Sequence, residues 1–246
     1  MTALLSTTYF GPVQWYQKLY RYDRVHIEQH ETFQKQTYRN RCLIATTQGV
    51  QALTVPIEHS PLTIDHSAAL SNNVQCSMVN VQCSMVNVQS IRLSDHGEWR
   101  RQHWQAIQSA YGESPFFEYY EDDLRPFFTE RRWELLIDFN DAICRKMCEL
   151  IDIHPNIDYT TEYLKPLTSP TGCLRSMSEQ GISNLKSQTS NLKDFRDVIR
   201  PKHPLSDPDF CAKPYYQVFA QKHGFLPNLS ILDLLLNMGP ESIFYL

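Results

Sequence analysis

The stretch that decides the fold is the N-terminal segment Ala3-Leu-Leu-Ser-Thr-Thr-Tyr-Phe-Gly-Pro-Val-Gln-Trp-Tyr-Gln-Lys-Leu-Tyr-Arg-Tyr-Asp-Arg-Val-His-Ile-Glu-Gln29. Ala3–Phe10 is rich in residues that favour a strand, and Pro12 suits the first turn of a helix. The apolar residues that follow recur at helical spacing, and Val25–Gln29 again favours a strand. The order strand, helix, strand predicts the opening of an α/β fold.

Downstream of this unit, Gln48-Gly49 marks a hairpin turn between two β-rich runs, Arg41–Thr47 and Val50–Glu58. From Ser94 onward the pattern becomes helical. Helices are predicted over about Glu98–Tyr111, over about Arg131–Asp152, and from a cap at Ser230, with Asp233 close to a capping box, to Gly239-Pro240. Short strands are predicted over Ser90–Leu93, Asp158–Leu164 and Tyr215–Phe219. The fold class is therefore α/β: a small mixed sheet that opens with a β-α-β unit and a hairpin, followed by a helical segment and a C-terminal helix.

The composition is that of an ordinary globular protein, with 42% apolar residues, 20% charged residues and a formal net charge of -4. Such a charge gives no general preference for nucleic acid or for an anionic membrane. No apolar run reaches the roughly 18 residues of a membrane-spanning helix. The N-terminus lacks the basic region of a secretory signal, so we expect a cytoplasmic protein. The seven cysteines form no CxxC pair, which favours reduced thiols and predicts no metal site.

Two short tandem repeats interrupt the chain. Asn73-Val-Gln-Cys-Ser-Met-Val79 recurs from Asn80, and Ser183-Asn-Leu-Lys186 recurs from Ser190. Both have the seven-residue period of a coiled coil, but two copies are too few, because a coiled coil needs three or four heptads. We interpret both as surface insertions, at about residues 72–89 and 175–194, because loops accept extra length at a small entropic cost.

The densest polar block follows the second predicted strand and reads Glu28-Gln-His-Glu-Thr-Phe-Gln-Lys-Gln-Thr-Tyr-Arg-Asn-Arg41. Ligands of open α/β sheets bind beyond the carboxyl ends of the strands, where this block is expected to lie. Arg39 and Arg41 share a face of an extended chain and suit a phosphate or a carboxylate. Glu28 and His30 also share a face and form a candidate catalytic acid–base pair. The block's other candidate substrate-binding residues are Gln34, Lys35, Tyr38 and Asn40. The alternative interpretation is a solvated loop and edge strand.

Three further segments carry candidate residues. Lys18 lies in the first predicted helix, whose N-terminal N–H groups favour an anion; ordinary strand–helix packing is the alternative. His103 lies beside the apolar face of its helix, either as a third catalytic candidate or as a hydrogen-bonded core histidine. Lys222 and Asn228 precede the C-terminal helix and are candidates for substrate binding, since that helix N-terminus also favours an anion.

Five blocks of the chain combine into a wider pattern. They are Tyr9-Phe-Gly-Pro-Val-Gln-Trp-Tyr-Gln-Lys-Leu19, Glu28–Arg41, Leu53-Thr-Val-Pro-Ile57, Ser109-Ala-Tyr-Gly-Glu-Ser-Pro-Phe-Phe117 and Phe225-Leu-Pro-Asn-Leu-Ser-Ile-Leu-Asp233. Together they resemble the WbqC-like protein family, although Gly11 stands where that family typically has proline. The resemblance breaks at the two repeats. It implies a single WbqC-like α/β domain over residues 1–246 and a role in the synthesis of bacterial surface polysaccharide of the O-antigen type, and it carries over no catalytic residues.

Two functions are compatible with these features. The first is a cytoplasmic enzyme of transferase type, acting by group transfer on an activated or amino sugar. Its substrate is a small molecule, with a nucleotide sugar as one candidate, and the sequence assigns no cofactor. The second is a non-catalytic binding or scaffold protein that docks glycan-biosynthesis enzymes through the aromatic stretch Phe116–Phe128, because no standard catalytic motif is present. Nucleic-acid binding is disfavoured, because no basic stretch is long enough to follow a backbone. An enzyme should bring Glu28, Arg39, His103 and Asn228 to one pocket.

Overall fold

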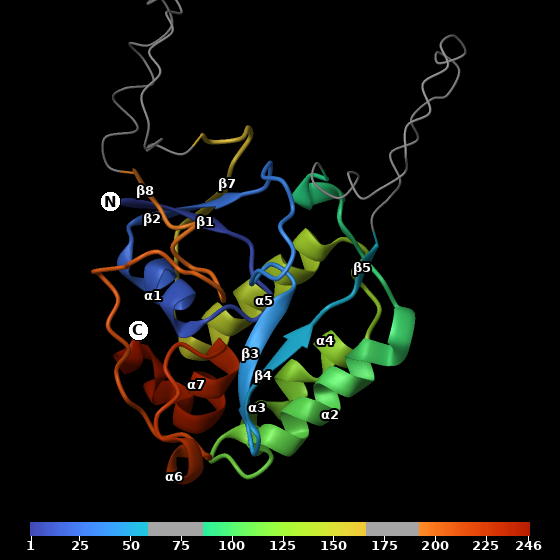
Figure 1. The fold of residues 1–246 in the computed structure, drawn as a ribbon, viewed down its shortest axis with the longest axis vertical. Helices are drawn as coiled ribbons and strands as arrows, with labels where there is room; N and C mark the ends of the chain where they lie inside the picture. The colour runs from blue at the N-terminus through green and yellow to red at the C-terminus, as the bar shows by residue number, and fades with distance from the viewer. Residues whose placement is uncertain (59–85, 166–191) are drawn as a thin grey trace, which may run out of the picture.

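A parallel sheet of four short strands lies at one end of the molecule (Figure 1). The computed structural model describes residues 1–58, 86–165 and 192–246. The strands, in the order β7-β2-β1-β8, are β1 (Thr2–Ser6), β2 (Arg24–Glu28), β7 (Ile157–Tyr159) and β8 (Leu192–Asp194). Helix α1 (Val13–Arg21) joins β1 to β2, so the predicted β-α-β unit is confirmed. Because every pairing in this sheet is parallel, the carboxyl ends of all four strands meet along one edge.

Two antiparallel pairs extend away from this sheet. Strand β3 (Arg41–Thr46) pairs with β4 (Gly49–Thr54), and Thr46 lies opposite Gly49 across the predicted hairpin turn. Gly49 has a φ of 107°, a backbone conformation that glycine reaches without steric cost. Strand β5 (Ile57–Glu58), which follows the hairpin, pairs with β6 (Arg92–Leu93), which precedes the helical half of the chain.

Helices fill the other end of the molecule, below the sheet in Figure 1. They are α2 (Trp99–Tyr111), α3 (Phe117–Leu124), α4 (Pro126–Thr129), α5 (Leu136–Ile151), α6 (Ala220–His223) and α7 (Ile231–Met238). 3-10 turns also occur at His96–Glu98, at Gly239–Tyr245 and, level with the sheet in this view, at Val88–Ser90. In that view α5 passes behind β3, and α2 lies on the side away from α1. Helix α7 is buried along most of its length, which agrees with the nearly unbroken apolar run of its sequence.

An aromatic core joins the β1–α1 loop to these helices. The ring of Tyr9 stacks on Phe139 of α5 with centroids 5.8 Å apart, and Phe10 stacks on Phe128 of α4 at 5.9 Å. Tyr9, Phe10 and Phe139 are each 0% exposed. Aromatic pairs of this kind contribute about 0.5–1.5 kcal/mol beyond the burial of their area. The loop that follows β1 is therefore anchored on its apolar side, which leaves its polar side chains to face the sheet edge.

The presence of glycine at position 11 has a steric explanation. A Cβ atom at this position would lie 2.4 Å from Thr8 Oγ1 and 3.0 Å from Thr8 Cβ. Because proline also carries a Cβ, the proline typical of the resembled family would require the Thr8 side chain to move. The turn between β1 and α1 is thus closed by Thr8 packing over a glycine.

Several predicted boundaries were wrong in the second half of the chain. Helix α5 begins at Leu136 and not at Arg131, because the preceding backbone is extended beside β6, where Leu93 N donates to Glu134 O at 2.8 Å. The strand expected over Asp158–Leu164 covers only Ile157–Tyr159.

Three findings concern the region after residue 190. Tyr215–Phe219 forms no strand; the Tyr215 side chain instead donates to Asp233 of α7. Strand β8 was not predicted. Ser230 does cap α7, accepting from Leu232 N at 3.3 Å, but the Asp233 carboxylate completes no capping box, because it accepts from Tyr111, Tyr215 and Gln217. Most of both predicted insertions lies outside the described residues; the last residues of each, 86–89 and 192–194, belong to the described fold.

Candidate functional site

A polar cleft of about 410 Å³ opens beyond the carboxyl ends of the parallel strands. Its lining follows three of them: residues after β2, after β7 and after β8 all contribute. The lining residues are His30, Glu31, Thr32, Gln34, Arg39, Tyr163, Arg196 and Asp197. The volume lies within the roughly 300–1,000 Å³ of ligand pockets, and this edge of a sheet is where α/β proteins bind ligands. We call it the carboxyl-edge cleft.

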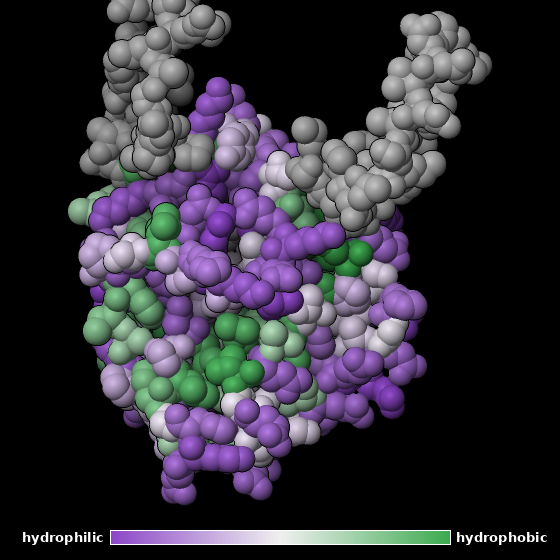
Figure 2. All heavy atoms as spheres, in the orientation of Figure 1, coloured by the Kyte–Doolittle hydropathy of each residue, from purple (hydrophilic) through white to green (hydrophobic). Residues whose placement is uncertain are grey.

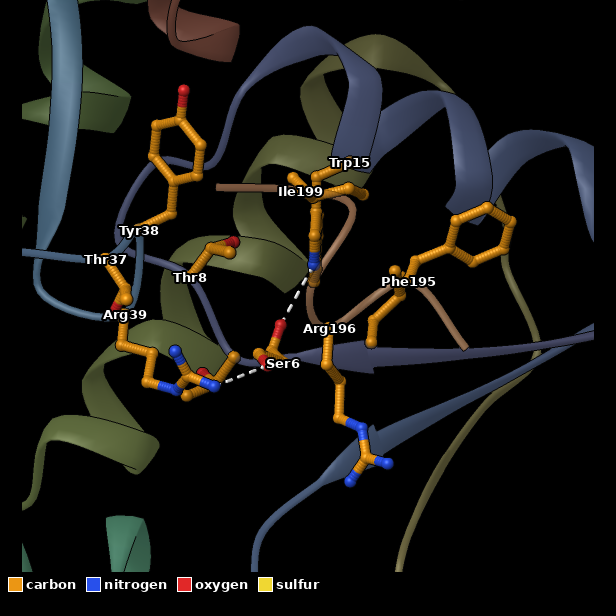
Figure 3. Close-up of a pocket in the computed structure, with 11 residues that line it drawn as sticks. Ser6, Thr8, Trp15, Thr37, Tyr38, Arg39, Phe195, Arg196 and Ile199 are labelled. Carbon is orange, nitrogen blue, oxygen red and sulfur yellow. Dashed lines mark hydrogen bonds between the residues drawn. The ribbon is translucent and has the colours of Figure 1, made fainter. Parts of the chain in front are cut away.

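The first ion pair of the cleft joins Arg39 to Glu31. Their side chains are 3% and 7% exposed. Arg39 Nε donates to Glu31 Oε1 at 2.7 Å, and Nη2 donates both to the other carboxylate oxygen and to Ser6 Oγ at the end of β1. Figure 3 shows this contact with Ser6. The bidentate geometry neutralises the guanidinium and fixes its plane.

The second ion pair centres on Arg196, two residues after β8. Its guanidinium donates to Asp194 and, through Nη1 at 3.3 Å, to Glu28, whose side chain is 0% exposed. Glu28 accepts three further bonds, from the His30 backbone N–H, from Thr160 Oγ1 and from the Leu164 backbone N–H, at 2.8–2.9 Å. A single buried carboxylate thus joins the segments that follow β2, β7 and β8.

Among the described residues that line the cleft, His30 is the one histidine. The side chain is half-buried, and Nε2 lies 3.1 Å from the Thr160 carbonyl oxygen. Because a carbonyl can only accept, Nε2 carries the proton, and Nδ1 of the neutral ring is left as an acceptor. The predicted Glu28–His30 pair is brought together, but through the His30 main chain, so the Glu28 carboxylate does not orient the imidazole directly.

Two segments from distant parts of the chain, residues 34–36 and 200–202, meet beside the cleft, and we call them the mouth; Gln34 lines the cleft, and Arg200 contacts the lining residues Gln34 and Asp197. Arg200 Nη2 donates to Gln34 Oε1 at 2.7 Å, and Lys202 Nζ donates to Gln36 Oε1 at 2.7 Å. Lys35 lies between the two glutamines and is exposed. These contacts place Gln34 and Lys35, both predicted to bind substrate, beside the opening.

A small inner cavity of about 10 Å³ adjoins the cleft, and Arg39 and Arg196 line both spaces. Trp15 Nε1 donates to the Ser6 carbonyl oxygen at 3.0 Å across it, and the Arg196 side chain extends away from Trp15 (Figure 3). Tyr38, predicted to bind substrate, lines this inner cavity instead of the cleft. Burial raises the pKa of Tyr38 to about 12, so its phenol is a neutral hydrogen-bonding group.

The predicted anion site at the start of α1 is closed by protein groups. Val13 N donates to Leu229 O at 3.0 Å, and Gln14 N donates to Asn228 Oδ1 at 2.9 Å. Asn228, predicted to bind substrate, therefore caps a helix from the far end of the chain. Lys18 is 1% exposed and pairs with Asp207 at 2.7 Å, so it does not reach the cleft.

The remaining predicted residues have structural partners elsewhere. His103 is 6% exposed and hydrogen-bonded to the Tyr9 hydroxyl at 2.9 Å; burial lowers its pKa to about 4, which is the core histidine of the alternative interpretation. Asn40 Nδ2 donates to Val55 O at 2.9 Å, and Arg41 Nε donates to Thr54 Oγ1 at 3.0 Å. Lys222 Nζ donates to Thr47 O at the hairpin turn.

The structure adds residues that the sequence did not single out. Ser6, Thr160, Tyr163, Asp194 and Arg196 hold or line the cleft together with Glu28, His30 and Arg39. Arg196 was missed because it lies just after the second repeat, which was interpreted as a surface insertion. The run Leu192-Lys-Asp-Phe-Arg196 carries no strand signal, because its two apolar residues are three apart and do not alternate with the charged ones.

Metal-ligand clusters and membrane-spanning helices are both absent from the part of the chain that the structure describes. No group of three or more His, Cys, Asp or Glu side chains is placed to hold a metal ion within residues 1–58, 86–165 and 192–246. In the same ranges, no helix has the length and apolar character needed to cross a membrane.

Comparison with known proteins identifies the family. A family model described as the WbqC-like protein family matches residues 7–80 and 69–245. The uncharacterized protein Rv1507c of Mycobacterium tuberculosis is 25% identical over 220 residues, which cover 87% of this chain and 83% of that protein. No solved structure matches the chain. Because the family model matches most of its length, including the segments that build the cleft, the chain belongs to the WbqC-like protein family.

Proposed function

We propose that this protein is a cytoplasmic enzyme that binds a sugar in the carboxyl-edge cleft and acts by group transfer on an activated or amino sugar, in the synthesis of bacterial surface polysaccharide. The observation that carries the proposal is the cleft itself. Polar groups from the ends of β2, β7 and β8 converge on one opening of about 410 Å³. The role in polysaccharide synthesis rests on the association of the WbqC-like family with O-antigen clusters.

The charge balance of the cleft floor favours a neutral, hydroxyl-rich ligand. We define the floor as the lining residues Glu31, Arg39 and Arg196 together with Glu28 and Asp194, the carboxylates that pair with Arg196 beneath them. It holds three carboxylates against two guanidinium groups. An anion placed there would meet positive charge that carboxylates already neutralise, and it would lose its own hydration. Sugar hydroxyls both donate and accept, so they can use carboxylate oxygens and guanidinium N–H groups together.

An aromatic ring completes the polar lining. Tyr163 is 46% exposed and lines the cleft, and the Arg196 guanidinium carbon lies 5.2 Å from its ring centroid. One face of a sugar ring presents C–H groups, which pack on an aromatic surface while the hydroxyls bond at the edges. The cleft therefore offers both contacts that a sugar uses.

His30 is the residue that we propose moves the proton. Its Nδ1 atom is an acceptor in the neutral ring, because Nε2–H is engaged by the Thr160 carbonyl. A sugar hydroxyl or amine that attacks an activated group must lose a proton, and a fixed imidazole in hydrogen-bonding reach accelerates such a step by about 10²–10⁴-fold. Glu28 has a positioning role, because it fixes the His30 backbone and Thr160.

The scaffold alternative loses its proposed surface. Within Phe116–Phe128, the side chains of Phe117, Tyr120, Phe127 and Phe128 are buried at 3–5% exposure, and Tyr119 is the residue that is strongly exposed, at 74%. An inward-facing aromatic stretch contributes to the core and leaves little apolar area for a partner. Of the four residues expected to converge in an enzyme, Glu28 and Arg39 meet at the cleft, whereas His103 and Asn228 have the structural partners described above.

The test is ligand binding by the full-length chain. A panel of free sugars, amino sugars and nucleotide sugars is screened by thermal shift, since a ligand that binds the folded state raises its apparent stability, and hits are quantified by calorimetry. Tyr163→Ala should weaken a hit, and Tyr119→Ala, which removes an exposed ring from α3 outside the cleft lining, should leave it unchanged.

His30→Gln separates binding from chemistry. Glutamine can still donate to the Thr160 carbonyl but offers no basic nitrogen. The assay uses a nucleotide sugar that binds as the donor, and the sugars and amines of the panel that bind as acceptors. The His30→Gln variant should still bind these ligands. Its rate of nucleotide release should fall by about 10²–10⁴-fold. Equal loss of affinity in the Tyr163 and Tyr119 variants, or no binding by any member of the panel, would contradict the proposal.

A further inference from the structure

We infer that the mouth of the cleft binds the phosphate of the ligand, so that the substrate is a phosphorylated sugar whose sugar ring points inward. This inference rests on the proposed function and names the substrate class that the same site takes. It differs from the sequence-based expectation, which gave the anion to Lys18, Arg39 and Arg41. All three have protein partners, and the first two are buried in ion pairs.

The positive charge of the mouth is not neutralised in the way that the charge of the floor is. Lys202 and Arg200 each donate to a glutamine amide oxygen, and an amide carries no net charge. Lys35 is exposed beside them. Asp197 is the carboxylate that pairs with Arg200. The two segments beside the opening therefore carry three cations, and one carboxylate pairs with them, whereas carboxylates are in excess on the floor.

The mouth is also held in a defined shape. Its two hydrogen bonds, both 2.7 Å long, join segments 166 residues apart in the chain. Gln36 has a φ of 60°, a left-handed conformation that a non-glycine residue keeps only where its surroundings hold it. The backbone at Lys35 thereby lies on a fixed turn, so less loop entropy is lost when this residue meets an anion.

The difference in charge between the floor and the mouth then determines which ligand the cleft binds. The floor excludes an anion and suits hydroxyls, and the mouth attracts an anion at the end that faces solvent. A sugar 1-phosphate or a nucleotide sugar carries both chemistries on neighbouring atoms, with the phosphate attached directly to the ring. Figure 2 agrees with this division of the surface: the upper part of this face, near the sheet edge, is mainly hydrophilic, and hydrophobic residues gather lower, over α7.

The experiment uses inorganic pyrophosphate as the probe, titrated calorimetrically into the full-length protein at low salt. The double variant Lys35→Gln/Lys202→Gln removes two mouth cations without altering a buried group. The double variant Arg101→Gln/Lys146→Gln removes the same charge from α2 and α5, away from the cleft lining. The mouth variant should bind pyrophosphate about tenfold more weakly, because two exposed charge pairs together correspond to about one order of magnitude. The control variant should bind like the wild type.

Two further readings complete the test. Salt near 0.5 M should remove the difference between the variants, since screening acts strongly on exposed charges. The matched sugar, sugar 1-phosphate and nucleotide sugar of any hit are then compared: the mouth variant should lose affinity for both phosphorylated forms and not for the free sugar. A loss confined to the nucleotide sugar would assign the mouth to the second phosphate or the nucleotide and overturn the assignment to the sugar phosphate.

The failures can be told apart. If pyrophosphate binds the wild type, the mouth variant and the control variant equally, the inference is wrong whatever the sugars do. If a sugar binds and depends on Tyr163 but its phosphate adds no affinity, the inference fails and the proposed function stands. If pyrophosphate depends on Lys35 and Lys202 while no sugar binds, the mouth is an anion site and the proposed function fails.

Discussion

His103 and Asp233 are both buried without a partner of opposite charge, and they affect stability in opposite directions as the pH changes. Burial lowers the pKa of His103 to about 4 and raises the pKa of Asp233 above its ordinary value. Both shifts have the same physical cause, which is the cost of a charge away from water. In each case the folded protein favours the neutral form.

For His103, stability should fall as the medium becomes acidic. The unfolded chain binds a proton below about pH 6.5, whereas the folded protein resists protonation down to about pH 4. The contribution is therefore fully present above pH 6.5 and is lost between about 6.5 and 4, by about 3 kcal/mol in total. His103→Gln keeps a polar group toward Tyr9 and does not titrate. Urea unfolding at pH 7.5 and pH 5 should show a wild-type advantage that shrinks at pH 5; a constant difference would contradict this assignment.

For Asp233, the sign is reversed. Its carboxylate accepts from Tyr111, Tyr215 and Gln217, and burial outweighs these bonds in raising its pKa. Because the folded state holds the proton to higher pH than the unfolded state does, stability should decline as the pH rises from the ordinary aspartate value through the raised one. Asp233→Asn replaces an acceptor by a donor that faces other donors, which should cost about 1–3 kcal/mol. Chemical unfolding from pH 4 to 8 should show this cost becoming smaller as the pH rises.

At the scale of elements, α1 depends on a residue from the other end of the chain. Asn228 caps its second N–H group and has a φ of 54°, in the left-handed region. Asn228→Ala loses the cap and adds backbone strain, so we expect a loss of about 1–3 kcal/mol in the free energy of unfolding. Asn228→Gly keeps the backbone conformation and loses only the cap. If denaturant titration gives the glycine variant the larger loss, the strain argument is wrong.

Local sequence signals predicted the elements whose contacts are local. The β1–α1–β2 unit and the hairpin at Gln48-Gly49 were predicted because turn residues and periodicity lie within each unit. Strand β8 has three residues, Leu192–Asp194, and acquires its strand identity by pairing with β1. Tyr215–Phe219 has the composition of a strand, but the Tyr215 hydroxyl and Gln217 amide bond to Asp233 instead. Tertiary partners decided both cases.

At the scale of the whole molecule, the local part of the candidate site was likewise predictable from sequence, and its distant part was not. Part of the polar block after β2 lines the cleft, since the block is contiguous in sequence and follows a buried strand. Its partners were not predicted, because Thr160, Tyr163 and Arg196 reach it only when β7 and β8 join the sheet. The role of Arg39 also changed: a residue expected to hold a ligand anion is buried against Glu31.

Arg196 tests how strongly the whole sheet edge depends on one contact. Arg196→Met leaves Glu28, which is 0% exposed, without its cation, and breaking a buried pair in this way should cost about 3–5 kcal/mol. The double variant Glu28→Gln/Arg196→Met should regain part of that loss, since the fully buried charge of Glu28 is then absent, although the partly exposed Asp194 still lacks its cation. Guanidinium unfolding of the two single variants and the double variant gives the coupling energy. A single-variant loss below about 1 kcal/mol would show that the edge does not depend on this pair.

Strand β1 lies in the interior of the sheet, and its neighbour β8, which begins at Leu192, follows far later in the chain. A ribosome adding about 5–20 residues per second therefore leaves one side of β1 unpaired for roughly ten seconds or more after β1 and β2 can meet. During that time Glu28 also lacks its ion-pair partner Arg196. An unpaired strand edge can form hydrogen bonds with another chain. Nascent chains of this protein, more than finished ones, are therefore the form that should recruit chaperones.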